Sequence, residues 1–382
     1  MNEQALYDLA PALRLALLGI AVAAGPLAWV WLRNRQAAPA QRLAALTVLT
    51  LFLTFDLVLF GAFTRLTDSG LGCPDWPGCY GNASPIGALH EIRAEEARMP
   101  TGPVTHGKAW VEMIHRYLAT GVGVLITTLM LATWMQRKRG LPVSPWWPAL
   151  TFVWVCVQGA FGALTVTMKL FPAIVTLHLL GGLVLLALLA MQAVAYRHAQ
   201  RGTGPAAIAP GARAWLVLAA MLLWVQVALG GWVSTNYAVL VCNEFPACQG
   251  SWWPAMDFRQ GFELWRDLGK TGEGEHVTLA ALTAIHYTHR LMAYAVFLVL
   301  GITAWRLRQG PLARIARWIA GLALWQFATG LSNVVLDWPL VAAVSHTGGA
   351  AALVVVLTWA LCESRAVPAH SAQGLRARGV SA

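Results

Sequence analysis

The sequence Glu-Met-Ile-His-Arg at residues 112–116 stands at the start of the apolar run 111–135. Glu112 and His115 are three residues apart, so on a helix they lie one turn apart on the same face. A second stretch, His-Tyr-Thr-His-Arg at residues 286–290, repeats this pattern with a histidine in place of the glutamate. We therefore expect two related helices that differ at one polar position.

The composition of the chain is that of a membrane protein. Of its 382 residues 58% are hydrophobic and 12% are charged, whereas a soluble domain normally carries about 25% charged residues. A helix needs roughly 20 apolar residues to cross a bilayer. Nine runs approach or exceed this length: 11–32, 43–64, 111–135, 146–168, 174–196, 214–237, 281–305, 313–335 and 341–362. The sequence predicts an all-α polytopic membrane protein.

The net charge of +10 has a topological explanation. Sixteen of the 27 Lys and Arg residues fall in five short connections that share one side of the membrane: Arg33, Arg35, Arg42, Arg137, Lys138, Arg139, Arg197, Arg201, Arg213, Arg306, Arg308, Arg314, Arg317, Arg365, Arg376 and Arg378. Nearly all acids lie on the other side. By the positive-inside rule, this predicts a bacterial inner-membrane protein with a periplasmic N-terminus and a cytoplasmic C-terminus. Nucleic-acid binding is not needed to explain the basicity.

The chain contains an internal repeat. Four landmarks recur in the same order at offsets of 168 to 174: Gly61, Cys73 and Cys79 match Gly230, Cys242 and Cys248; His115-Arg116 matches His289-Arg290; Gln158 matches Gln326; and His178 matches His346. Four helices per copy keep both copies in one membrane orientation. We expect two pseudo-symmetric four-helix bundles, 43–200 and 201–364. They are preceded by an accessory transmembrane helix with its inner linker, 1–42, and followed by a cytoplasmic tail, 365–382. The first helix has arginines after its apolar run and acids before it, the reverse of a signal peptide.

A cysteine pair marks each outer loop. Cys73 and Cys79 lie in the first loop and Cys242 and Cys248 in the second, both with C-x5-C spacing. On an oxidising face each pair can form a local disulfide. Free thiols or a metal site are the alternatives, although no further ligand stands at suitable spacing nearby. The charged remainder of the first loop, 88–108, is expected to be mobile.

Each half offers two histidines near the outer ends of its helices: His115 and His178 in the first, His289 and His346 in the second. Imidazoles on facing helices of a four-helix bundle can hold haem iron from both axial sides. A single interfacial histidine is explained by water or backbone partners, and zinc would require a third or fourth ligand. Four histidines paired by the repeat favour two bis-histidine haem sites, towards the periplasmic side.

The neighbouring residues distinguish the two sites. Arg116 and Arg290 are placed to meet haem propionates, or to anchor their helices at the interface. Glu112 beside a haem edge could transfer protons or stabilise developing positive charge. The second copy has His286 instead, which could also compete with His289 for the iron. We therefore predict catalysis in the N-terminal half and a resident electron-transfer haem b in the C-terminal half.

These residues resemble the haem A synthase family of the proteobacterial and mitochondrial type. The resemblance covers about residues 43–362 and rests on 61–70, the Trp-Pro loop with its cysteines, 112–116, His178, His289-Arg290 and His346. It implies two four-helix halves. The C-terminal half would hold haem b, and the N-terminal half would oxidise the C8 methyl of haem O to a formyl group by successive hydroxylations, supplying haem A to cytochrome oxidase.

By this resemblance, His115 and His178 would ligate the substrate haem and Glu112 would be the catalytic carboxylate. His289 and His346 would ligate haem b. Some members of the family carry cysteine pairs in both outer loops, as this chain does. The accessory first helix departs from the family's eight-helix pattern.

Two other functions explain part of the sequence. An electron-transfer cytochrome b accounts for four histidines, but not for a glutamate in one copy alone. A transporter accounts for the repeat and for Asp56, an acid well inside the bilayer that could also be protonated or paired; however, the other polar residues lie near the outer face. Expected partners are haem O, haem A, membrane lipid, a haem O synthase or electron donor, and a further copy of the chain.

Overall fold

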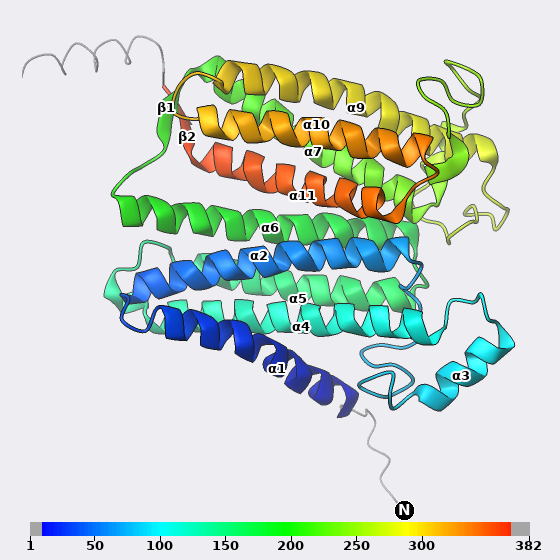
Figure 1. Cartoon of the computed structure of the whole chain (residues 1–382), viewed down its shortest axis with the longest axis horizontal. Helices are drawn as coiled ribbons and strands as arrows, with labels where there is room; N and C mark the ends of the chain where they lie inside the picture. Colours follow the sequence, from blue (N-terminus) through cyan, green and yellow to red (C-terminus); the bar gives the residue numbers. More distant parts are fainter. Residues whose placement is uncertain (1–9, 368–382) are drawn as a thin grey trace, which may run out of the picture. The chain divides into compact units, whose positions relative to one another are not determined.

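The computed structural model describes residues 10–367 and is almost entirely helical (Figure 1). Its long helices are α1 (Ala10–Arg33), α2 (Pro39–Leu66), α4 (His106–Met135), α5 (Trp146–Thr167), α6 (Pro172–Arg201), α7 (Pro210–Thr235), α9 (Leu279–Leu307), α10 (Ala313–Val335) and α11 (Leu340–Cys362). The shorter elements are α3 (Leu89–Arg98), α8 (Phe258–Gly261), the 3-10 turns η1 (Arg137–Arg139) and η2 (Ala238–Val241), and strands β1 (Ala206–Ile208) and β2 (Ser364–Ala366). The predicted N-terminal end and the tail residues 368–382, with Arg376 and Arg378, lie outside the described residues.

Between residues 10 and 367, eight helices are long and apolar enough to cross a membrane. They are α1, α2, α4, α5, α6, α7, α9 and α11. The ninth predicted run, 313–335, forms the 23-residue helix α10, whose Gln326, Ser332 and Asn333 make it less apolar. The prediction of an all-α polytopic membrane protein is confirmed.

Threonine caps set the start of the two helices that carry the repeated motif. The Thr105 hydroxyl accepts a hydrogen bond from the backbone N–H of Lys108 at 3.3 Å, and α4 begins directly after it. Thr278 caps α9 in the same way, accepting from the N–H of Ala281 at 3.2 Å. Side-chain caps satisfy N–H groups that have no partner within the helix. The caps therefore start both helices before the apolar runs.

Contacts divide the chain into two compact units. Of the described residues, the first unit comprises 10–185 with Glu263–His276, and the second comprises Leu186–Phe262 with 277–367. The division falls within α6, and it assigns part of the second outer loop to the first unit. There Trp265 packs against Phe171, with ring centroids 4.8 Å apart.

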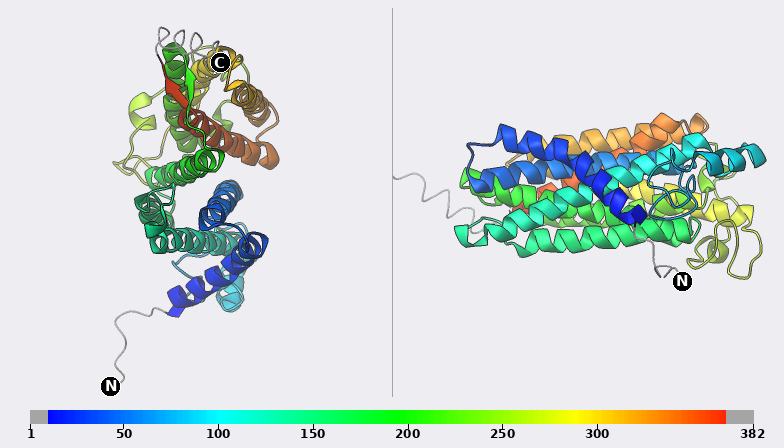
Figure 2. Two further views of the ribbon diagram at one scale, coloured as in Figure 1. Left: turned by 90° about the vertical axis from the view of Figure 1, so that its left-hand side faces the viewer. Right: turned by 90° about the horizontal axis from the view of Figure 1, so that it is seen from below.

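In the first unit, α4 packs against α1, α2 and α5. Helix α1 crosses α4 obliquely (Figure 2). A Cβ atom added to Gly19 would lie 2.3 Å from Thr120 Cγ2, and one added to Gly121 would lie 2.9 Å from Val22 Cγ1. Small residues allow helices to approach closely where hydrocarbon surrounds them. The accessory helix therefore docks on α4 through two glycines.

In the second unit, four helices form a closed cycle of contacts: α7 packs on α9, α9 on α10, α10 on α11, and α11 on α7. The parallel strands β1 and β2 pair at the end of these helices opposite the outer loop (Figure 1). They join the segment before α7 to the segment after α11. Arg213 adds a hydrogen bond from its Nη1 to Ser364 Oγ at 2.8 Å.

The outer loops repeat one another in detail. Cys73 and Cys79 are joined with an S–S distance of 2.06 Å, and Cys242 and Cys248 with one of 1.90 Å. Each loop contains a cis proline, Trp76-Pro77 in the first and Phe245-Pro246 in the second. A β-bridge follows each second cysteine, Cys79 to Asn82 and Cys248 to Ser251. The two loops therefore have the same local fold.

The charged segment 88–108, which we expected to be mobile, contains helix α3. Ile92 is fully buried there, in a small apolar core with Cys73, Cys79 and Met113. Ile92, the buried residue of α3, thus attaches this segment to the disulfide.

Candidate functional site

Each of the four predicted ligand histidines lies against a glycine of a neighbouring helix. The pairs are His115 of α4 with Gly61 of α2, His178 of α6 with Gly162 of α5, His289 of α9 with Gly230 of α7, and His346 of α11 with Gly330 of α10. A Cβ atom at these glycines would lie 3.0, 3.6, 2.9 and 3.2 Å, respectively, from the imidazole Cε1. At Gly61, Gly230 and Gly330 a side chain would crowd the imidazole, whereas at Gly162 it would meet the ring at an ordinary contact distance. The repeat therefore extends to the packing of the histidines.

The structure brings the histidines together in two pairs. His115 and His178 belong to the first unit and are close enough to interact electrostatically. His289 and His346 have the same relation in the second unit. Among residues 10–367, no group of three or more His, Cys, Asp and Glu side chains could hold a metal ion. A donor set of two imidazoles suits the axial positions of haem iron.

Glu112 is buried beneath the first disulfide loop, with 4% of its surface exposed. Its Oε2 accepts a hydrogen bond from the backbone N–H of Cys73 at 2.8 Å. Its Oε1 forms an ion pair with Arg116, one turn further along α4. A charge is retained in a buried position when such partners compensate it. Glu112 is thus a fixed, charge-compensated group one turn before His115.

The two motif arginines attach the outer loops to their helices. Arg116 Nη1 donates to the carbonyl oxygens of Asp75 at 2.9 Å and Pro77 at 3.2 Å, and to that of Gly78. Arg290 donates to the carbonyl oxygens of Glu244 and Ala247 at 2.9 Å and of Cys242 at 3.2 Å. Sequence reasoning missed this role, because backbone carbonyl acceptors leave no signal in the sequence. The predicted contact with haem propionates stays a prediction.

His286 occupies the position of Glu112 in the second unit and is 7% exposed. Its Nδ1 lies 2.8 Å from the carbonyl oxygen of Ala238, and its Nε2 lies 3.5 Å from Arg290 Nη2. His286 is thus engaged with its outer loop, whereas His289 lies against Gly230. This arrangement favours His289 as the partner of His346.

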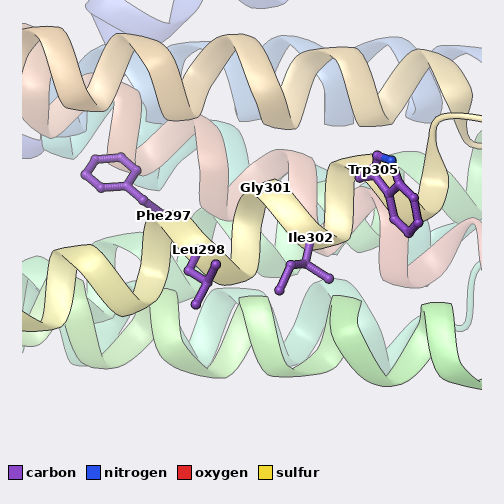
Figure 3. A pocket seen from close by; sticks show the side chains of 5 residues that line it. All are labelled: Phe297, Leu298, Gly301, Ile302 and Trp305. Carbon is purple, nitrogen blue, oxygen red and sulfur yellow. The ribbon is translucent and has the colours of Figure 1, made fainter.

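A separate hollow of about 530 Å³ runs along α9 (Figure 3). It is lined by Phe297, Leu298, Gly301, Ile302 and Trp305. None of the four predicted ligands contributes to it, and its nearly apolar lining suits lipid chains. The hollow is distinct from the histidine pairs.

The fold and the site together define a polytopic membrane protein with an internal repeat and one histidine pair in each half. The chain belongs to the COX15-CtaA family of cytochrome oxidase assembly proteins, whose profile matches residues 44–358. This confirms the resemblance inferred from the motifs.

Several curated relatives are similar over most of their length. A protein named Heme A synthase from Shewanella oneidensis is 37% identical over 310 residues, which cover 81% of this chain and 92% of the relative. Proteins of the same name from Rhizorhabdus wittichii and Halalkalibacterium halodurans are 26% and 24% identical, over 85% and 80% of this chain and 96% and 90% of their own lengths. The similarity therefore includes both halves of the repeat.

Proposed function

We propose that this protein is a haem A synthase. It oxidises the C8 methyl group of haem O to a formyl group, by way of a hydroxylated intermediate, for the assembly of cytochrome oxidase. Family membership and the relatives named Heme A synthase support this function. The structural observation that carries it is the difference between Glu112 and His286 in otherwise matched surroundings.

The four histidines divide between substrate and cofactor. His115 and His178 hold haem O, and His289 and His346 hold a resident haem b. The glycine behind each imidazole and the two-imidazole donor sets support this assignment. When bound, haem b supplies one-electron transfer.

Glu112 provides the acid–base function of the first site. Its carboxylate lies one turn from His115 and is held by Cys73 N–H and Arg116. From this position it can accept a proton or stabilise positive charge that develops at the methyl carbon. A neutral imidazole at position 286 supplies no negative charge, which suits an electron-transfer site.

The protein works in a bacterial inner membrane with both histidine pairs towards the periplasm. The distribution of Lys and Arg supports a periplasmic N-terminus and a cytoplasmic C-terminus. Its further partners are a haem O synthase that delivers the substrate and a protein or quinol electron donor.

Haem extraction and mass analysis test the function. Wild type, Glu112→Gln and the control Glu363→Gln are purified from cells that make haem O. Glu363 is a matched control because it pairs with Arg197 and His198 at the other end of the helices. We expect haem B with haem A or its hydroxylated precursor in wild type and control, and haem B with unconverted haem O in Glu112→Gln.

The same experiment decides the alternative, an electron-transfer cytochrome b. The glycine–histidine contacts common to both halves favour that function, because they make the two sites alike. Two molecules of haem B per chain in all three proteins, without any oxidation product of haem O, would establish the electron-transfer cytochrome and exclude the synthase.

A further inference from the structure

The imidazole Nδ1 atoms have different surroundings in the two units. In the second unit, Thr329 Oγ1 lies 3.0 Å from Nδ1 of His346, and Gln226 Nε2 lies 3.1 Å from Nδ1 of His289. In the first unit, Nδ1 of His115 and Nδ1 of His178 are buried and have no hydrogen-bond partner among the described residues. One histidine pair is therefore held by side chains, and the other is not.

The repeat explains this difference residue by residue. Thr329 directly precedes Gly330, the glycine behind His346, and the equivalent residue before Gly162 is Phe161. The side chain of Phe161 has no polar atom that could replace the Thr329 hydroxyl.

Gln226 stands four residues before Gly230, the glycine behind His289. Four residues before Gly61, the matching glycine of the first unit, the chain has Leu57. Both hydrogen-bonding side chains of the second unit are thus replaced by hydrocarbon in the first.

The hydrogen bonds of Thr329 determine which nitrogen of His346 can bind a metal. Its hydroxyl donates to the carbonyl oxygen of Trp325 at 2.8 Å, so a lone pair of the hydroxyl oxygen remains to accept a hydrogen bond from Nδ1–H of His346. A neutral imidazole that carries its proton on Nδ1 has its free lone pair on Nε2. Thr329 therefore leaves Nε2 as the nitrogen of His346 that could bind iron.

Gln226 holds His289 in a different way. Its Nε2 donates to the backbone carbonyl oxygen of His289 at 3.1 Å and lies 3.1 Å from Nδ1 and 3.4 Å from Nε2 of the ring. Within residues 10–367 its Oε1 is buried and has no hydrogen-bond partner. Because the amide is anchored on the backbone while it lies beside the ring, Gln226 fixes the orientation of the His289 imidazole.

We propose that Gln226 and Thr329 are positioning residues: Thr329 fixes the tautomer of His346 and Gln226 fixes the ring orientation of His289, so that haem b is held permanently. Leu57 and Phe161 leave the first pair without such bonds, so that a substrate haem can enter and its product can leave. The inference rests on the proposed function, because it assigns exchange to the first site. A hydrogen bond to the second nitrogen of a metal-bound histidine raises the basicity of the ligand, and its loss typically weakens metal binding 10- to 100-fold.

The test uses the full-length protein with the variants Thr329→Val and Gln226→Leu. Loss of haem B to excess apomyoglobin and the reduction potential of the low-spin haem are both measured. We expect haem loss to become about 10- to 100-fold faster. In Thr329→Val the potential should also rise, because a less basic imidazole stabilises ferric iron less. Thr329→Ser restores the hydroxyl and should restore both values.

Thr133→Val is the matched control. The Thr133 hydroxyl is buried and donates to the carbonyl oxygen of Leu129 within α4, as Thr329 does to Trp325 within α10, but no hydrogen bond joins it to a histidine in the described part of the chain. We expect wild-type haem retention and potential. The converse variant Phe161→Thr supplies an acceptor beside His178 and should slow the release of haem from the first site.

The outcomes separate the two proposals. Wild-type retention and potential in both Thr329→Val and Gln226→Leu would overturn the positioning role, even in a protein that makes haem A. If no haem A is formed but these variants still lose haem B faster, the positioning role stands and the synthase function falls. If Thr329→Val does not fold, Gln226→Leu and Phe161→Thr decide the matter alone.

Discussion

The disulfide segments of the two outer loops are closely alike, since each has a disulfide, a cis proline, a β-bridge and an arginine that donates hydrogen bonds to its carbonyl oxygens. The residues beneath the loops differ. The first loop covers Glu112, which accepts a hydrogen bond from Cys73, and the second covers His286, which contacts the carbonyl oxygen of Ala238. The comparison teaches that the repeat preserves the backbone of the disulfide segments and varies the polar side chain that lies beneath each of them.

The largest effect is expected when the two sites are made alike. Glu112→His gives the first motif the sequence of the second at its distinguishing position. Loss of the carboxylate should reduce haem O conversion by at least about 100-fold, the lower range for general acid–base groups. The haem A to haem O ratio of extracted membranes measures this.

His286→Glu is the companion to that variant. It should retain conversion, because the altered residue lies in the other unit. Equal conversion of haem O in Glu112→His and wild type would show that the difference between Glu112 and His286 does not affect catalysis.

Arg116 and Arg290, which bind the carbonyl oxygens of the outer loops, should differ in their contribution to the free energy of unfolding. Arg116→Ala leaves Glu112 buried without its counter-charge and should cost about 3–5 kcal/mol. Arg290→Ala leaves only unpaired carbonyl groups and a histidine, so about 1–3 kcal/mol is expected. Thermal unfolding in detergent, followed by tryptophan fluorescence, compares them. Glu112→Gln added to Arg116→Ala should recover part of the loss; equal losses in the two single variants would contradict an electrostatic difference.

A smaller effect on stability is expected when the glycines that contact the histidines are replaced. Gly330→Ala places a Cβ atom 3.2 Å from His346, whereas Gly162→Ala places one at an ordinary contact distance of 3.6 Å from His178. Overpacking typically costs about 1–3 kcal/mol, so Gly330→Ala should lower the unfolding temperature and haem retention, and Gly162→Ala should change neither. The reverse order would show that the second ring can move more easily than the first.

The smallest effect is expected at Asp56. The repeat places Val225 at the same position of the second half, and both side chains are exposed on their helices. Within the described part of the chain, no hydrogen bond involves Asp56, so Asp56→Val should leave haem content and conversion unchanged. A loss of conversion without loss of haem would instead place Asp56 on a proton path.

Much of the fold could be predicted because its signals are local. The lengths of the apolar runs predict the helices, and the constant offset of the repeat predicts which residues of the two halves correspond. The short spacing of Cys73 and Cys79, repeated in the second loop, suits a local disulfide. The starts of α4 and α9 were missed by a few residues because Thr105 and Thr278 extend them beyond the apolar runs.

The rest depends on contacts that a linear pattern does not contain. Helix α3 is polar except for residues such as Ile92, whose burial is decided by the disulfide loop it meets. The guanidinium groups of Arg116 and Arg290 donate to backbone carbonyl oxygens. Because every residue has a carbonyl group, the sequence does not show which ones are bound. The contacts of Gln226 and Thr329 depend on the rotation of α7 and α10 about their own axes, and that is set by packing on the neighbouring helices.

The strand pair β1–β2 has a mechanical consequence. Because the strands are parallel, the chain enters the pair at Ala206 and leaves it at Ala366, at opposite ends of the same ladder. A force that pulls the segment after Val367 away from the segment before Ala206 therefore shears the ladder and loads its hydrogen bonds together instead of opening them one by one.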